Sequence, residues 1–343
     1  MTLPVAPPLE PMLAKAEASI PQSTGWLYEP KWDGFRALIF RDGDQLRIDS
    51  RNSLPLQRYF PELVTPLQSA LPDRCIVDGE IVIATPTGLD FDALQLRLHP
   101  ADSRVRMLAA QSPASVVLFD MLALGDDDLR SRPLHERRAL LLQTVAATVQ
   151  VGITPQTESP DEATQWFERY EGAGLDGVVA KPRDGDYRHG ERRWVKVKHL
   201  RTVDCVVGGF RPLTKGTGVG SLLLGLYEGS VLHHVGHTSG FSAAERREIL
   251  ARLEPLVGGD SFGYGSSPGG PSRWKRAQEL AWTPVQPALV CEVSFDHLQG
   301  HRFRHAARFL RWRPDRDPRS CTFEQLAPPE QFSLDDIVVV PGR

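Results

Sequence analysis

The chain has 343 residues, 41% of them hydrophobic and 24% charged, a composition that suits two domains with hydrophobic cores. No stretch approaches the roughly 18 apolar residues of a membrane span, and residues 1–22 lack the apolar core of a signal peptide, which predicts a cytoplasmic protein without membrane attachment. The formal net charge of -3 gives no overall indication of nucleic-acid binding, so such an activity would depend on local basic patches.

The first part of the chain mixes predicted strands with predicted helices. Strands are expected in short β-branched or apolar runs over 36–40, 45–49, 76–83, 116–122, 177–181 and 194–198. One helix is expected after Pro133 and another after the capping box that begins at Ser159. The irregular alternation predicts an α+β domain over residues 1–201.

The remainder, residues 202–343, is predicted to be a second domain. Strands are expected over 203–210, 221–227, 231–237, 288–295 and 307–312. Ser242 and Glu245 form the capping box of a single convincing helix. Five short strands with one helix suit a small OB-type β-barrel, and residues 261–271 are expected to form a flexible loop. The four cysteines lie far apart in sequence and are expected to be buried thiols.

Lys31 is the most informative residue, and its neighbours are Glu29-Pro30-Lys31-Trp32-Asp33-Gly34-Phe35-Arg36. A lysine amine can attack phosphorus only after losing its proton, which near neutral pH requires nearby cations or desolvation. Arg36 and a divalent metal ion could supply that positive field. The plainer interpretation is a surface lysine before an Asp-Gly turn, which this segment alone leaves open.

Further charged residues interrupt the predicted apolar strands. Asp78 and Glu80 share one face of a strand, and Glu80 could bind a sugar hydroxyl or a metal ion. Asp176 precedes the strand that ends in Lys181, and a carboxylate at a strand end is a natural metal ligand. Because a regular strand would point these two side chains to opposite faces, Asp176 is the preferred site residue.

Two lysines and one aromatic residue complete the candidate phosphate and base contacts. Lys196 and Lys198 share a strand face, which suits polyphosphate binding, although lysine pairs also occur on ordinary solvated strands. Phe119 could stack on a purine, although core packing is the commoner role of such a residue. Basic stretches over 188–201 and 302–319 offer local patches for phosphate backbones.

Taken in order, these segments resemble the nucleotidyltransferase motifs of ATP-dependent DNA ligases and capping enzymes. The motifs are Lys31 to Arg36, Ser50-Arg51-Asn52, Asp78-Gly79-Glu80, Phe119-Asp120, Asp176 to Lys181, Trp194 to Lys198 and Phe309 to Arg316. Within that superfamily the chain is most similar to compact bacterial ATP-dependent DNA ligases, which are relatives of the ligase domain of bacterial end-joining enzymes. The resemblance covers nearly the whole chain and implies an adenylation domain with ATP-grasp-like sheets followed by an OB-fold domain.

The resemblance also implies roles for individual residues. Lys31 would carry AMP as a covalent phosphoramidate, and Asp176 and Glu80 would bind Mg²⁺ or Mn²⁺. The implied nucleotide contacts are Glu29 beside adenine through its backbone, Phe119 stacked on adenine, Arg36 and Glu80 at the ribose or phosphate region, Arg51 at a phosphate, Lys196 and Lys198 at the α-phosphate, and Arg313, Asp315 and Arg316 at the leaving pyrophosphate.

Three positions depart from the family pattern. Asp176 stands where many relatives have glutamate, and Arg316 stands where many have lysine. The stretch 187–193, which usually supplies a nucleotide-binding arginine, has compressed spacing, and Arg192 is chosen over Arg188.

The predicted activity is the sealing of 5′-phosphate/3′-hydroxyl nicks in duplex DNA through lysyl-AMP, in DNA repair or end joining. A monomer is expected, with repair polymerases or end-binding proteins as candidate partners and a hinge over 199–204. The alternatives are an RNA ligase, a capping-type guanylyltransferase, or an OB protein with an inactive nucleotide pocket. Two histidine groups, His233/His234/His237 and His297/His301/His305, the second at helix-like spacing, favour DNA contact or packing over zinc binding.

Overall fold

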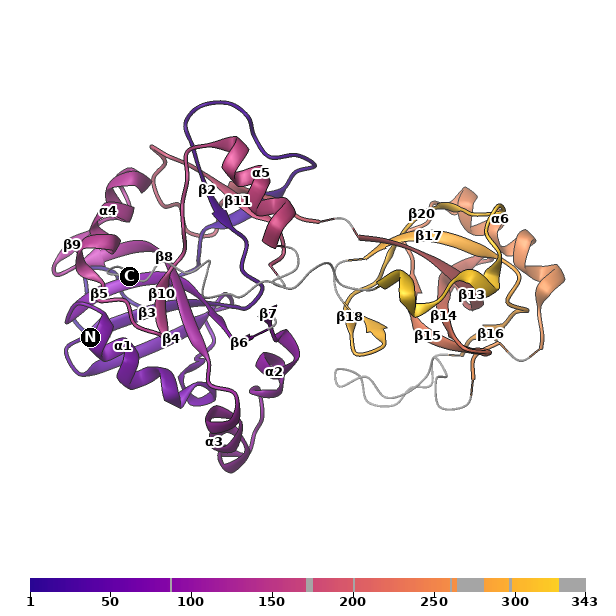
Figure 1. Ribbon diagram of the computed structural model, residues 1–343, viewed down its shortest axis with the longest axis horizontal. Helices are drawn as coiled ribbons and strands as arrows, with labels where there is room; N and C mark the ends of the chain where they lie inside the picture. The colour runs from indigo at the N-terminus through magenta and orange to yellow at the C-terminus, as the bar shows by residue number, and fades with distance from the viewer. Residues whose placement is uncertain are drawn as a thin grey trace. The chain divides into compact units, whose positions relative to one another are not determined.

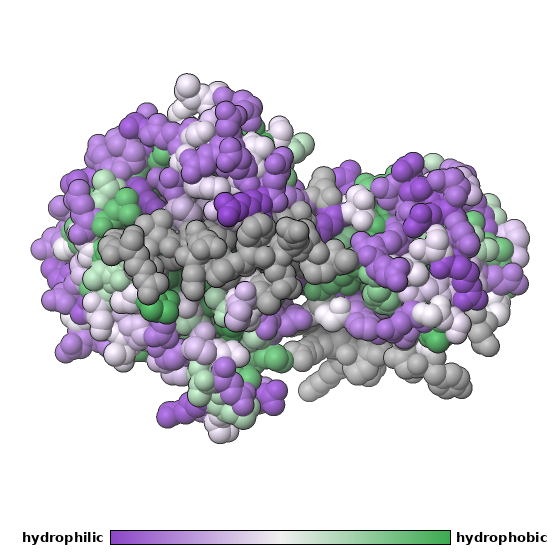
Figure 2. All heavy atoms as spheres, in the orientation of Figure 1, coloured by the Kyte–Doolittle hydropathy of each residue, from purple (hydrophilic) through white to green (hydrophobic). Residues whose placement is uncertain are grey.

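The computed structural model describes residues 1–86, 88–170, 175–199, 201–259, 261–263, 281–295 and 298–326 (Figure 1). Their contacts form two compact units, which divide at residue 200, beside the predicted domain boundary. Figure 2 shows hydrophilic side chains over much of the visible surface of each unit. Among the described residues, no helix has the length and apolarity that a membrane crossing requires.

The first unit contains two main β-sheets. The larger sheet has the strand order β10 (Val151–Ile153), β8 (Ser115–Leu124), β5 (Arg74–Val82), β3 (Phe35–Asp42) and β4 (Gln45–Ser50), and β9 (Asp127–Asp128) pairs with β8. The smaller sheet has the order β1 (Leu13–Ala16), β12 (Arg192–Val197), β11 (Val178–Pro182) and β2 (Trp26–Pro30). The chain passes from β2 in one sheet to β3 in the other through residues 31–34, so Lys31 lies where the sheets are joined.

Helices and short elements complete this unit. They are β6 (Ala84–Thr85), β7 (Gly88–Leu89), α1 (Val64–Ala70), α2 (Phe91–Leu96), α3 (Asp102–Gln111), α4 (Leu134–Thr144), α5 (Pro160–Arg169) and the 3₁₀ turns η1 (Gln57–Tyr59) and η2 (Pro61–Leu63). The predicted capping residue Ser159 accepts a hydrogen bond from the Glu162 amide. The α+β class is therefore confirmed.

Alternation along β3 gives the larger sheet two buried faces. Ala37 and Ile39 enter the main core of the unit, whereas Leu38 and Phe40 enter a second core. That second core also contains Trp194 of the smaller sheet. Packing between the sheets thus fixes the elements that carry the predicted motifs.

The second unit is an antiparallel sheet of five main strands closed into a barrel. Its strand order is β15 (Val231–Thr238), β14 (Val219–Glu228), β13 (Arg201–Pro212), β17 (Val290–Phe295) and β20 (Arg308–Trp312). A bridge between Thr238 and Ala307 joins the two ends of the sheet, and α6 (Ala243–Leu253) lies between β15 and β17 in the chain. Capping of α6 by Ser242 is present as predicted. Five strands, their order and one helix match the predicted OB-type barrel.

The shorter elements of the second unit are β16 (Thr283–Pro284), β18 (Leu298–Gln299), β19 (Arg302–Phe303), η4 (Glu254–Leu256), η5 (Pro318–Ser320) and η6 (Phe323–Leu326). The helix-like spacing of the second histidine group does not correspond to a helix. The strands β18 and β19 form a hairpin in this region, and its turn has Gly300 at φ 56°. His297 and most of the loop predicted over 261–271 lie outside the described residues. All four cysteines are buried and free, as expected.

Candidate active site

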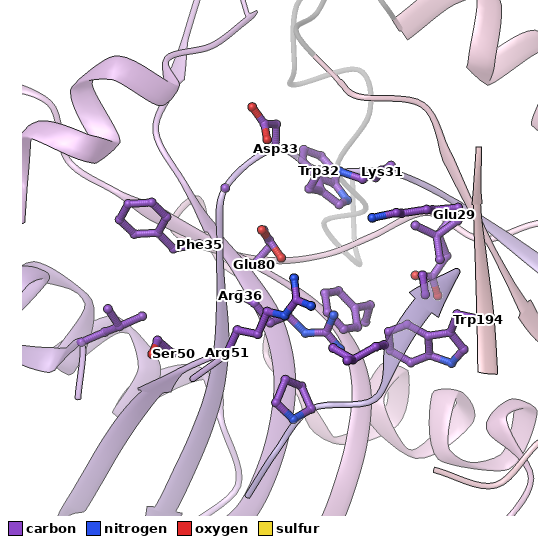
Figure 3. Close-up of a pocket in the computed structure, with 18 of the residues that line it drawn as sticks. Glu29, Lys31, Trp32, Asp33, Phe35, Arg36, Ser50, Arg51, Glu80 and Trp194 are labelled. Carbon is purple, nitrogen blue, oxygen red and sulfur yellow. The ribbon is translucent and has the colours of Figure 1, made fainter. Parts of the chain in front are cut away.

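The first unit contains a cavity of about 810 Å³ beside the joined sheets (Figure 3). The predicted site residues that line it are Glu29, Lys31, Arg36, Arg51, Glu80, Phe119, Lys196 and Lys198. They come from both sheets and from the connections between strands. Residues that are distant in sequence are thus brought to one space, as a nucleotide site requires.

The position of Lys31 is set by backbone contacts with the segment that precedes β11. Its amide donates to the Gly177 carbonyl at 2.8 Å, and its carbonyl accepts from the Asp176 amide at 2.9 Å. Gly177 has φ +125°, and a Cβ at this position would lie 2.0 Å from the Val197 carbonyl oxygen. Only glycine allows this close approach, which brings Asp176 beside the lysine.

The Asp176 carboxylate holds two lysines of the cavity. Its Oδ2 lies 2.7 Å from the Lys31 amine and 2.6 Å from the Lys198 amine, and the Asp176 side chain is 5% exposed. Burial opposes ionisation of Asp176, but the two ammonium groups outweigh burial and hold its pKa below the usual range. Burial is the largest single influence on Lys31 and lowers its pKa, but the charge and hydrogen bond of Asp176, together with the charges of Asp33 and Glu80, outweigh burial, so the pKa of Lys31 is raised overall. Lys31 is therefore protonated in this arrangement.

Lys196 lies on β12, and its pKa is shifted in the opposite direction from that of Lys31. Burial first, and then the charges of Lys198 and Lys31, lower the pKa of Lys196. Lys31, Lys196 and Lys198 thus bring three positive charges to the cavity, and Asp176 pairs with two of them. Such a field suits a polyphosphate, whose oxygens accept charge-assisted hydrogen bonds.

The sequence analysis did not include Lys181 among the predicted site residues, but Lys181 lines the same cavity as Lys31. Its amine lies 2.6 Å from Glu29 Oε2, and both side chains are almost fully buried. The amine also lies over the rings of Phe119 and Trp194, 4.2 and 4.3 Å from their centroids. Asp176 precedes β11 (Val178–Pro182), so strand alternation does not relate the direction of its side chain to that of Lys181.

The Arg36 guanidinium is held by the buried carboxylate of Asp78. Its Nε and Nη2 each lie 2.5 Å from an oxygen of Asp78, which also accepts a hydrogen bond from the Tyr187 hydroxyl at 2.6 Å. The Arg36 guanidinium lies over the rings of Phe119 and Trp194, at 4.5 and 4.9 Å from their centroids. Asp78 therefore orients Arg36 rather than facing the cavity itself.

Arg51 is presented by a tight loop after β4. The Ser50 amide donates to the Leu54 carbonyl at 2.8 Å, and the Ser53 amide donates to the Ser50 carbonyl at 2.8 Å. Ser53 has φ 57°, the one positive φ of a non-glycine residue in the described part of the chain. A backbone held in this sparsely populated region is common where a side chain must be aimed at a site.

Glu80 is the second candidate metal ligand. Burial raises its pKa to about 7, although Arg36 and Lys31 favour the charged form. No cluster of three or more His, Cys, Asp or Glu side chains in the described ranges could hold a metal ion by itself. Glu80 and Asp176 supply the one or two carboxylates that suit Mg²⁺ bound mainly through substrate phosphates, so the donor set fits a nucleotide-borne metal ion.

Arg192, Arg313, Asp315 and Arg316 are not among the residues that line this cavity. Arg192 is exposed and does not line it, and its Nη1 donates to the Ala14 carbonyl at 3.3 Å. Arg313 and Asp315 belong to the second unit and form an ion pair with a separation of 2.8 Å. Arg316 lies 3.5 Å from the carboxylate of Asp204 in the same unit.

Comparisons with known proteins agree with this geometry. Residues 11–198 match the family model described as ATP dependent DNA ligase domain, and residues 215–316 match the model described as ATP dependent DNA ligase C terminal region. This chain belongs to the ATP-dependent DNA ligase family. It is 51% identical over 360 residues to DNA ligase C of Mycobacterium tuberculosis (strain ATCC 25618 / H37Rv), covering 100% of this chain and 99% of that protein.

More distant relatives match the same two-domain region. The multifunctional non-homologous end joining DNA repair protein LigD of the same strain is 30% identical, over 92% of this chain and 40% of LigD. A solved structure from a study of Lig E DNA ligases has a TM-score of 0.53 and 17% identity, covering 88% of this chain and 99% of that one. The latter likeness concerns the fold. The chain is thus an ATP-dependent ligase with a nucleotidyltransferase-type domain and a C-terminal OB-type domain.

Proposed function

We propose that Lys31 is the nucleophile of this ligase and that its substrate is a nick in duplex DNA. The observation that carries the proposal is the Lys31 amine in the cavity, held by Asp176 and flanked by Lys196 and Lys198. The neutral amine attacks the α-phosphorus of ATP, so a P–N bond forms while the bond to pyrophosphate breaks. AMP then passes to a DNA 5′-phosphate, and a 3′-hydroxyl displaces it to form the phosphodiester.

The surrounding residues have complementary roles in the proposal. Lys196 and Lys198 neutralise the α-phosphate, which is the main requirement of phosphoryl transfer. Glu80 and Asp176 would hold Mg²⁺ or Mn²⁺, which would supply neutralisation of charge on the phosphates. Because Asp176 also pairs with Lys31, loss of that contact would remove the largest influence that raises the pKa of the amine.

The base and the sugar are assigned to the other wall of the cavity. Glu29 lies at the adenine end, where its carboxylate is paired with Lys181. Phe119 offers a ring for stacking, and Arg36 and Arg51 contact the ribose or a phosphate. Arg192 is assigned a supporting nucleotide contact on motif resemblance alone.

The arginines of the second unit complete the proposal. Arg313 and Arg316 act on the leaving pyrophosphate, together with Asp315, which pairs with Arg313. The similarity to a protein named for end joining and DNA repair supports a role in repair. The monomeric state is proposed from the sequence alone.

The test uses two matched variants, Lys31→Ala and Lys15→Ala. Lys15 is exposed and pairs with Glu17 at 2.8 Å, so its loss should be silent. Each protein is incubated with α-labelled ATP or GTP and Mg²⁺, and then with nicked duplexes that carry DNA or RNA on each side. We expect lysyl-AMP, by intact mass, in the wild type and in Lys15→Ala only. Adenylate on Lys31→Ala, or labelling by GTP, would refute the proposal.

A further inference from the structure

Two carboxylates hold Arg313 from different sides. Its Nη1 lies 3.0 Å from both oxygens of Asp204, on β13. Its Nε and Nη2 bind Asp315, at 2.9 Å from Oδ1 and 2.8 Å from Oδ2 respectively. A guanidinium offers five N–H donors in a rigid fork, so two carboxylates on its opposite edges fix the plane of the group.

The two acids differ in how firmly they are themselves held. The Asp204 side chain is 10% exposed, whereas that of Asp315 is 62% exposed. The Asp204 amide donates to Gln325 Oε1 at 3.2 Å, and its carbonyl accepts from Gln325 Nε2 at 3.2 Å. Asp204 also lies within the β13–β17 ladder, opposite Glu292. Asp204 is therefore held rigidly by the barrel, whereas the exposed Asp315 can be displaced from Arg313 by another anion.

Asp204 faces the second arginine as well. Its Oδ2 lies 3.5 Å from the Arg316 Nε. That nitrogen is buried and has no hydrogen-bond partner among the described residues. The Asp204 carboxylate on β13 thus contacts both Arg313 and Arg316, which lie on the turn after β20. These contacts fix the positions of both arginine side chains relative to the barrel.

We propose that Asp204 is a positioning residue for the departure of pyrophosphate from ATP. This inference rests on the proposed role of Arg313 and Arg316. A pyrophosphate oxygen competes with the exposed Asp315 for the guanidinium, while the buried Asp204 keeps the opposite edge in place. The effect should be confined to lysine adenylation, because the final joining of an adenylated nick releases AMP and no pyrophosphate.

The chain offers a matched control. Glu292 lies opposite Asp204 in the ladder and pairs with Arg311, its Oε2 being 2.6 Å from the Arg311 Nε. Asp204→Asn and Glu292→Gln each convert one carboxylate of the same sheet into an amide. We expect Asp204→Asn to slow lysyl-AMP formation about tenfold to a hundredfold, as misaimed catalytic groups do. Glu292→Gln should retain the wild-type rate.

Two measurements separate positioning from general damage. Sealing of a nick that already carries AMP on its 5′-phosphate should proceed at the wild-type rate in Asp204→Asn. In an Arg313→Ala/Arg316→Ala background, adding Asp204→Asn should cause no further loss of adenylation, because the groups it positions are gone. A loss in both steps, or an additional loss in that background, would overturn the inference.

The inference and the proposal on which it rests can fail separately. Wild-type adenylation by Arg313→Ala would remove the role of Arg313 in pyrophosphate departure, and the inference with it. Slow adenylation by Arg313→Ala together with a wild-type rate in Asp204→Asn would overturn only the role of Asp204.

Discussion

Replacing Glu29 with glutamine should destabilise the first unit strongly. The change leaves the Lys181 amine, now 2.6 Å from a carboxylate oxygen, buried beside an uncharged amide. Burial already lowers the pKa of Lys181, and Glu29 is the largest influence that opposes this shift. Breaking a buried ion pair by removing one partner costs about 3–5 kcal/mol. At about 2–4 °C per kcal/mol for a domain of this size, the melting temperature should fall by roughly 6–20 °C.

The control is Glu158→Gln, the same substitution in an ion pair on the surface. Glu158 lies 3.2 Å from Arg183, and their side chains are 67% and 37% exposed, so its removal should cost about 1 kcal/mol or less. Thermal unfolding followed by tryptophan fluorescence compares the two variants. The deficit of Glu29→Gln should shrink as the pH rises towards the lysine range, because a neutral amine needs no counter-charge. Equal melting temperatures for the two variants would refute the reasoning.

Two further predictions concern Glu80 and Gly177. The folded protein keeps a proton on Glu80 up to about pH 7, whereas the ordinary carboxyl releases it near 4.5, so the free energy of unfolding should fall as the pH rises between these values. Glu80→Gln should remove that slope in urea titrations, and an unchanged slope would contradict the raised pKa. Gly177→Ala should lower both stability and lysyl-AMP formation, because its Cβ would lie 2.0 Å from the Val197 carbonyl oxygen. Gly43 also has a positive φ, +62°, but a Cβ there would meet no atom within 4 Å, so Gly43→Ala should cost only about 1–2 kcal/mol and leave adenylation unchanged. Similar losses in the two glycine variants, measured by chemical denaturation and α-labelled ATP, would argue against the close contact.

Local patterns predicted the strands and helices well where alternation or capping was strong. The run that forms β5 and the capping boxes at Ser159 and Ser242 are present as expected. The strands β1 and β2 were not predicted, because each is short and has neither clear alternation nor a turn signal beside it. Both belong to the smaller sheet, and their existence depends on pairing with β12 and β11, which are distant in sequence.

In the site, too, local patterns could be predicted from the sequence, whereas contacts between distant residues could not. Motif resemblance identified Glu29 and Lys31, but periodicity gave no reason to pair Glu29 with Lys181 across two strands. The signal that could have found the pair was a lysine within an otherwise apolar strand, since such a residue is rarely buried without a partner. Asp204 has the same character, being an acid between Val203 and Cys205 in β13. Charges that interrupt buried strands were thus the most informative features of this sequence.

The ion pair between Lys31 and Asp176 bears directly on the proposed role of Lys31 as the nucleophile. In this structure Asp176 raises the pKa of Lys31, which is the opposite of what attack on phosphorus requires. The pair protects the lysine from premature reaction, because an ammonium group has no free lone pair. Burial is the largest single influence on Lys31 and lowers its pKa, and Asp176 is the largest influence that opposes it, so loss of the Asp176 contact would lower the pKa of the amine. Deprotonation of the amine would therefore require the Asp176 contact to be weakened first.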